Sequence, residues 1–329
     1  MKILLICDKI IVNLIRLEVL NLLENFIMIT QQVLVLFILI VIGFVCGKKG
    51  LINDTTSKGI TNIVLYVVTP CVMITAFQRN FSFELLGNVI IAAACAALIM
   101  TGSILISTLI FRDKNESRKK VLQFSTVFSN CGFMSLPLQK AILGDNGWFY
   151  GSIFVAVFNL FVWSYGLVSM SGDKKQLSLK KIAFNPGIVG VLIAVILFIS
   201  SITLPYIISQ PMQYLSELNT PLPMLIIGYH LSKADFKKAF TDSGAYLAMG
   251  IRLVLIPTLA TLILSLLPLD KDMIIAFIIA SSAPTAATTT MFASKFNRDV
   301  ELSVSAVAST TLVSVITMPV IVAFAQTIL

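Results

Sequence analysis

Two apolar segments of the chain, residues 120–143 and 271–295, are interrupted near their centres by polar residues and proline. Proline removes a backbone donor and opens a helix, and backbone groups freed at membrane depth need new partners. The pattern therefore predicts two broken helices that face each other and form a polar site. The alternative is two simple kinks, whose Ser and Thr side chains bond only their own backbone. The interrupting residues are Ser129, Asn130, Cys131, Gly132 and Pro137 in the first segment, and Ser281, Ser282, Pro284, Thr285 and Thr288–Thr290 in the second.

The expected charge preference of this site depends on helix dipoles and on one arginine. The second half of each broken helix would direct its positive N-terminus to the middle of the membrane, but the negative C-terminus of each first half lies nearby. Arg252 lies about ten residues into the segment 242–267, hence about 15 Å deep. A buried arginine is costly unless it is paired or functional, so Arg252 favours an anion site. It could instead reach to the interface or pair with Glu217.

The composition requires a membrane environment for these segments. Of 329 residues, 57% are hydrophobic and 12% charged, and the mean hydropathy is +0.94. Soluble proteins carry about 25% charged residues. The net charge of +8 does not indicate nucleic-acid binding, because the basic residues lie in short gaps between apolar runs. The five cysteines have neither CxxC nor Cys/His spacing, so no metal or other cofactor is predicted.

The apolar pattern predicts an all-α integral membrane protein with ten transmembrane helices in one domain, 29–329. Residues 1–28 read as an amphipathic extension, and Met28 as a possible true start. The halves 29–170 and 185–329 contain five spans each and form inverted repeats. The predicted spans are 29–47, 58–77, 86–111, 120–143, 148–170, 185–203, 208–232, 242–267, 271–295 and 302–328.

Most of the 24 Lys and Arg residues lie in the odd-numbered loops. The positive-inside rule places these loops in the cytoplasm and both termini outside the plasma membrane. Inverted repeats are typical of secondary transporters. The pairs Thr69-Pro70 and Thr220-Pro221, in the second and seventh spans, support the repeat and place both threonines among the candidate site residues. No P-loop, HExxH or GxSxG motif indicates an ATP-driven pump or an enzyme.

Several motifs, in order along the chain, resemble those of the auxin efflux carrier family, which includes bacterial malate permease-like proteins. The most specific is SNCGFMSLP at 129–137, followed by LGDNG and FNLFVWSYG. Further matches are Asn185-Pro186, TPLPMLIIGYHLS, IRLVLIP and SSAPTAATTTMFASKFNRD. The resemblance covers nearly everything from Met28 onwards. Plant members have proline where this chain has Ser129, which leaves the geometry of the first break open.

The resemblance implies a fold similar to sodium/proton antiporters and bile-acid symporters, with broken helices 4 and 9 crossing at the site. Spans 1, 2, 6 and 7 would form a scaffold and the contact of a homodimer. Spans 3–5 and 8–10 would form a transport domain that moves like an elevator. The resemblance places Asn130, Pro284 and Thr285 at the crossing.

The predicted function is a secondary carrier, an efflux carrier or permease, for a small organic anion such as malate. Two alternatives stay open. One is a sodium-coupled organic-anion symporter of the bile-acid type, with Thr285 and Thr288–Thr290 as oxygen ligands. The other is a membrane sensor without transport. The candidate substrate-binding residues are Thr69, Ser129, Asn130, Cys131, Thr220, Arg252, Pro284 and Thr285.

Overall fold

The computed structural model describes residues 26–177, 180, 183–233 and 242–329. This part of the chain is helical and contains no strand. The predicted N-terminal extension lies outside the described residues up to residue 25. Six helical segments among the described residues are long and apolar enough to cross a membrane, namely Phe26–Lys48, Asp54–Ala76, Phe83–Ile110, Cys131–Ser171, Ser243–Leu264 and Val300–Ile328.

The remaining predicted spans are shorter or interrupted, which the apolar pattern alone does not show. The sixth is the 14-residue helix α9. The fourth, seventh and ninth each consist of two helices separated by residues 128–130, 218–220 and 283–287. The α-helices after Phe26–Lys48 are α2 (Asp54–Ile63), α3 (Thr69–Ala76), α4 (Phe83–Ile110), α5 (Glu116–Val127), α6 (Leu136–Phe161), α7 (Leu167–Ser171), α9 (Pro186–Ile199), α10 (Tyr206–Glu217), α11 (Pro221–Lys233), α13 (Ser243–Gly250), α14 (Ile256–Leu264), α15 (Lys271–Ser282), α16 (Thr288–Lys295) and α17 (Val300–Ile328).

Three widened helical turns precede prolines. The π-helical turns Val64–Val68, Cys131–Ser135 and Ile251–Leu255 each end two residues before Pro70, Pro137 or Pro257. Proline lacks an N–H group and its ring clashes with the carbonyl four residues earlier, so a wider turn lets the helix continue. The pair Thr69-Pro70 is therefore part of a continuous span.

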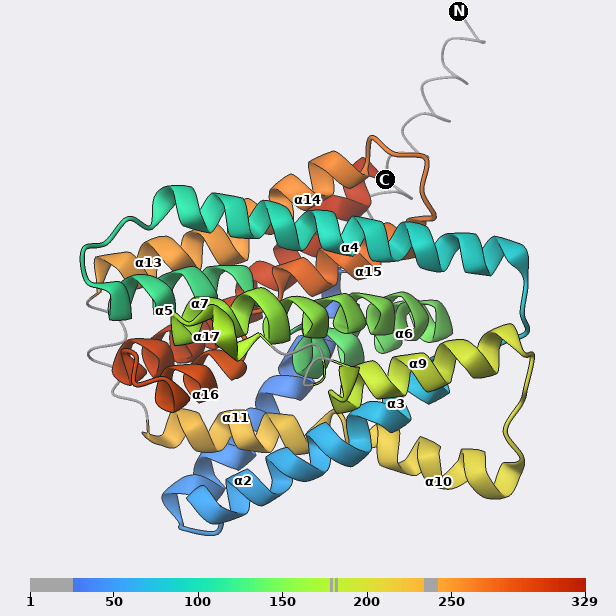
Figure 1. Ribbon diagram of the computed structural model, residues 1–329, viewed down its shortest axis with the longest axis horizontal. Helices are drawn as coiled ribbons and strands as arrows, with labels where there is room; N and C mark the ends of the chain where they lie inside the picture. The colour runs from blue at the N-terminus through green and yellow to red at the C-terminus, as the bar shows by residue number, and fades with distance from the viewer. Residues whose placement is uncertain (1–25, 178–179, 181–182, 234–241) are drawn as a thin grey trace, which may run out of the picture.

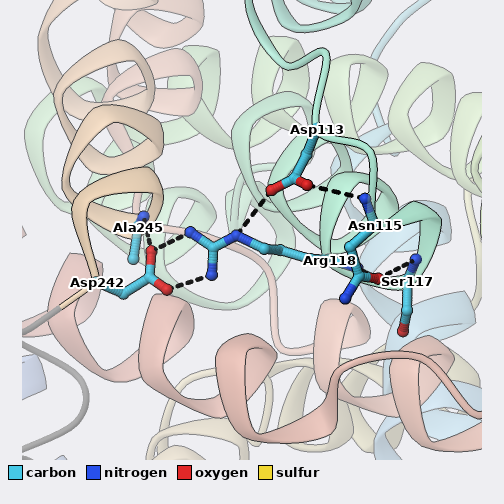
Figure 2. Close-up of polar contacts among 6 residues, drawn as sticks. All are labelled: Asp113, Asn115, Ser117, Arg118, Asp242 and Ala245. Atoms are coloured by element: carbon cyan, nitrogen blue, oxygen red, sulfur yellow. Dashed lines mark hydrogen bonds and ion pairs between the residues drawn. The ribbon is translucent and has the colours of Figure 1, made fainter.

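Side-chain caps determine where several helices begin. Ser82, Asn115, Asp242, Asp270 and Asp299 each accept a hydrogen bond from a backbone N–H in the first turn of the helix that follows. These groups satisfy donors that have no partner within the helix. Figure 2 shows two of the caps, Asn115 before α5 and Asp242 before α13.

The helices form two groups that do not follow the order of the chain (Figure 1). In one group, α3 packs against α9 and α10, and α11 packs against α2. In the other group, α4 packs on α5 and α6, while α15 contacts α6, α14 and α17. Each group combines helices from the first and second halves of the chain.

Glycine permits the closest backbone contact in the first group. A Cβ atom on Gly228 of α11 would lie 2.0 Å from the carbonyl oxygen of Ile40. A Cβ atom on Gly43 would lie 2.3 Å from the carbonyl oxygen of Leu225. Both distances are far below van der Waals contact, so the helix Phe26–Lys48 and α11 can approach this closely only without these side chains.

Candidate functional site

The interruptions between α5 and α6 and between α15 and α16 pair with each other. The Asn130 N–H donates to the carbonyl oxygen of Pro284 at 2.7 Å, and the Ala286 N–H donates to that of Phe128 at 2.9 Å. Ser129 and Thr285 thereby form an antiparallel β-bridge. The two breaks cross, and each satisfies backbone groups that the other exposes.

Thr285 uses its polar groups to hold this crossing together. Its hydroxyl donates to the carbonyl oxygen of Ser125 at 2.9 Å, and its N–H donates to the Thr310 hydroxyl of α17 at 3.1 Å. The residue is 1% exposed. Thr285 therefore joins α5 and α17 to the second break.

Arg252 lies in the π-helical turn before α14 and is 2% exposed. Its Nη1 donates to the carbonyl oxygens of Thr126 and Val127 at 3.1 and 3.0 Å, and its Nη2 donates to that of Ser281. These carbonyls belong to the last turns of α5 and α15. Arg252 therefore caps the negative ends of both first half-helices. It neither reaches the interface nor pairs with Glu217, which lines a separate cavity.

A cavity of about 60 Å³ lies beside the crossing. None of its lining residues is charged. Its polar lining comes from both breaks and from the adjoining helices, and its apolar lining includes Val72, Met73 and Phe158. The polar members are Thr69, Ser129, Asn130, Asn159, Asn219 and Thr288.

Two helix starts border the cavity and add partial positive charge to its surroundings. Gly132 and Phe133 belong to the turn that leads into α6, and Thr288 is the first residue of α16. N–H groups in the first turn have no partner within the helix, and together they carry about half a positive charge. Because Arg252 covers the opposing C-termini, the cavity faces mainly the positive ends.

Two side chains at the cavity retain hydrogen-bonding capacity. Among the described residues, the Asn130 carboxamide makes no side-chain hydrogen bond, although Asn130 is 4% exposed. The Thr288 hydroxyl is buried and has no partner in the described part of the chain. Buried polar groups normally have partners, so both groups are placed to meet a ligand or water.

The candidate residues predicted from the sequence occupy three different places. Thr69, Ser129 and Asn130 line the cavity. Four others, Cys131, Arg252, Pro284 and Thr285, are buried and do not line it. Thr220 lines a larger cavity instead.

Asn219 and Asn159 belong to the cavity although neither was among the predicted site residues. The Asn219 Nδ2 donates to the carbonyl oxygen of Gly132 at 2.9 Å, which joins the interruption between α10 and α11 to the start of α6. Asn219 stands directly before Thr220-Pro221, so a polar residue next to a helix-breaking proline was the available signal.

Two further cavities are lined by residues from opposite ends of α11, one by Thr220 just before its start and the other by residues of its second half. One, of about 440 Å³, is lined by Arg79, Lys140, Glu217 and Thr220 among others. The other, of only about 10 Å³, is lined by His230 and Thr290 among others. Partial burial lowers the pKa of Arg79, yet arginine stays protonated in proteins. The larger cavity is therefore lined by two cations, Arg79 and Lys140, and by two carboxylates, Asp145 and Glu217, and Lys140 pairs with Asp145.

No group of three or more His, Cys, Asp or Glu side chains in the described residues is placed to hold a metal ion. The polar groups of the crossing are amides, hydroxyls and helix ends. Such groups interact with their surroundings by hydrogen bonds and partial charge.

Long apolar helices, together with two broken helices that cross beside a small polar cavity, are consistent with a multi-pass membrane protein. The sequence pattern of the membrane transport protein family matches residues 28–322, and the chain belongs to this family. The match confirms the resemblance to the auxin efflux carriers.

Two relatives have similar length. The chain is 24% identical over 298 residues to the uncharacterized transporter MJ1031 of Methanocaldococcus jannaschii. The aligned region covers 86% of this chain and 94% of that protein. It is 23% identical over 293 residues to an uncharacterized transporter of Methanothermobacter thermautotrophicus, which covers 88% of this chain and 96% of that protein.

Proposed function

We propose that this protein is a secondary carrier that moves a small organic anion through the crossing of its two broken helices. The observation that carries the proposal is the uncharged cavity bordered by two helix N-termini, whose opposing C-termini are capped by Arg252. A carboxylate matches this arrangement because it accepts several hydrogen bonds and favours helix N-termini.

The polar side chains of the cavity suggest how a carboxylate would be held. The Asn130 carboxamide and the Thr288 hydroxyl can donate to it, together with first-turn N–H groups of the two second half-helices. The space of about 60 Å³ suits a carboxyl group better than a whole aromatic acid, so the rest of a larger substrate would extend toward the cavity of about 440 Å³.

The carrier would contain ten membrane segments in two inverted repeats. The long segment Cys131–Ser171 would supply the second half of the fourth segment and, after the kink at Gly144, the fifth. Both breaks that cross lie at equivalent positions of the two halves. The excess of Lys and Arg in the odd-numbered loops favours a plasma-membrane orientation with these loops in the cytoplasm and both termini outside.

An elevator movement fits the two helix groups. The group of α2, α3, α9, α10 and α11 would stay fixed and provide the contact of a homodimer, while the group with the crossing would slide past it. The cavity of about 440 Å³ would be the external entrance, and the space of about 10 Å³ at His230 the closed cytoplasmic side. Export of an anion gains about 2.3 kcal/mol per charge per 100 mV of inside-negative potential.

The test is transport by the purified chain in proteoliposomes, recorded as current on a solid-supported membrane. The solutes are malate, other dicarboxylates and aromatic carboxylates. Asn130→Ala and Thr288→Val remove the two free polar groups. Their matched controls are Asn62→Ala, at an exposed position of α2, and Thr289→Val, whose hydroxyl is equally unpartnered but fully buried away from the cavity.

We expect a saturable current for at least one carboxylate. Asn130→Ala and Thr288→Val should each raise its KM about tenfold, as the loss of one charge-assisted hydrogen bond of about 1.5 kcal/mol requires. Asn62→Ala and Thr289→Val should leave KM unchanged. Absence of current for every acid in folded protein, or equal loss in the control variants, would contradict the proposal.

A further inference from the structure

Three polar groups of the crossing converge on Arg252, and all of them are backbone carbonyls. They come from Thr126 and Val127 at the end of α5 and from Ser281 near the end of α15. The guanidinium thus contacts both first half-helices at their negative ends. The side chain is 2% exposed, so the guanidinium is shielded from bulk water.

Arg252 has no carboxylate partner among the described residues. The ion pairs found there are made by Arg118, Lys119, Lys140 and Lys233. A buried charge without compensation is costly. Here the compensation is the two helix ends, each of which carries about half a negative charge. The single charge of the guanidinium therefore balances both.

This balance leaves the two positive helix starts at the cavity without an internal counter-charge. They too carry about half a charge each, so one monovalent carboxylate would neutralise them. A carboxylate side chain beside Arg252 would have cancelled the preference of the cavity for an anion. The arrangement leaves it to a ligand to neutralise the two helix starts.

Half-helix C-termini and unwound carbonyls at a helix break are the groups with which transporters coordinate a coupling Na⁺. In this chain those carbonyls already accept hydrogen bonds from Arg252. We propose that Arg252 is a built-in substitute for a coupling cation, so that the crossing binds its anion without Na⁺. This inference rests on the proposed function, in that the bound solute is an anion.

The first experiment needs no substrate. Thermal unfolding of the purified full chain in detergent is followed in NaCl and in choline chloride at equal ionic strength, for the wild type, Arg252→Ala, Arg252→Lys and Arg118→Ala. Arg118 provides the matched control because it also joins α5 to α13, but near the surface.

We expect the wild-type Tm to be the same in both salts. Arg252→Ala should lower the Tm and should then gain a few degrees with Na⁺ in a saturable manner, because a bound ion stabilises the folded state. Arg252→Lys should behave like the wild type, since an ammonium also supplies a fixed positive charge. Arg118→Ala should lower the Tm equally in both salts.

A saturable Na⁺-dependent rise in the wild-type Tm would overturn the proposal. So would a folded Arg252→Ala protein with no preference for Na⁺ over choline. If Arg252→Ala does not fold, the wild type and Arg252→Lys decide the matter, because a gain of Na⁺ dependence in Arg252→Lys would contradict the role of a fixed charge.

The second experiment measures malate-driven current in proteoliposomes with Na⁺ or choline. An unchanged current supports the proposal, and loss of current in choline overturns it. If no carboxylate gives current, the proposed function fails, whereas the unfolding experiment still decides whether Arg252 takes the place of a cation.

Discussion

Two arginines join α5 to the helices α13 and α14, at opposite ends of α5. Arg118 lies in the first turn of α5, where its Nη atoms contact both carboxylate oxygens of Asp242 and its Nε donates to Asp113 at 2.9 Å (Figure 2). Arg252 reaches the last turn of α5 and contacts carbonyls there. One arginine is paired with acids and the other with helix ends.

The difference follows from their surroundings. The side chains of Arg118 and Asp242 are 25% and 24% exposed, so water can stabilise either charge when the pair opens. Arg252 is 2% exposed, so bulk water has little access to its guanidinium, and a carboxylate partner would add negative charge beside the crossing. The comparison shows that an ion pair suits the partly exposed edge of the helix bundle, whereas helix dipoles can balance a charge in its buried centre.

The largest expected effect is on transport when Arg252 is replaced. Arg252→Met keeps an unbranched side chain but removes the charge and leaves three carbonyls without partners. We expect the transport rate to fall at least about 100-fold, which corresponds to about 2.7 kcal/mol and to about 1 kcal/mol for each carbonyl. The measurement is the initial current in proteoliposomes at saturating substrate.

Arg118→Met is the control for that experiment and should retain most of the rate. Its partner Asp242 can be solvated, and α13 keeps its N-cap through the same carboxylate. Equal losses in the two variants would break the comparison, because both arginines would then act only by holding α5 in place.

The next largest expected effect is the energetic coupling between Arg118 and Asp242. Asp242→Asn preserves the N-cap, since asparagine also accepts from the first helical turn. A double-mutant cycle with Arg118→Ala should give a coupling of about 1 kcal/mol, at the upper end for a partly exposed pair. Reversible unfolding of the full chain by SDS titration in micelles gives the free energies.

The combination of Asp242→Asn with Arg252→Met should be additive. The two positions are ten residues apart on one helical segment, about 15 Å along its axis, and share no partner. A coupling as large as that of the ion pair would mean that the two arginines belong to one network.

The sequence predicted the two breaks because their causes are local. Proline, glycine and short polar side chains weaken a helix wherever they occur, and the crossing lies within two residues of Asn130 and Thr285. The burial of Arg252 also agrees with its position well inside the segment. Its partners could not be predicted, because Ser281 is brought to it by packing between helices far apart in the chain.

The pairs Thr69-Pro70 and Thr220-Pro221 show where local pattern fails. They seemed equivalent, yet a π-helical turn lets the helix continue through Pro70, whereas the chain is interrupted before Pro221. Thr69 therefore lines the cavity at the crossing and Thr220 the larger one. Whether a helix bends or breaks at a proline depends on whether its free carbonyls find partners. In the helix that contains Pro137, for example, the carbonyl oxygen of Gly132 accepts a hydrogen bond from Asn219.

The smallest expected effect is a pH dependence that only the surface pair should show. The hydrogen bond from Arg118 lowers the pKa of Asp242 in the folded protein. Above the unfolded pKa of about 3.9 the carboxylate is charged and the pair contributes fully. The contribution is lost as the pH falls through the lower folded pKa, because protonation then removes the ion pair.

Stability of the wild type should therefore fall more steeply below about pH 4 than that of Asp242→Asn. Arg252→Met should keep the wild-type slope, since arginine stays protonated throughout and its carbonyl partners do not titrate. SDS titrations of the three proteins between about pH 3 and 7 compare the slopes. A changed slope in Arg252→Met would mean that an acid balances the buried arginine, and the distinction between an ion pair at the edge and helix dipoles at the centre would be lost.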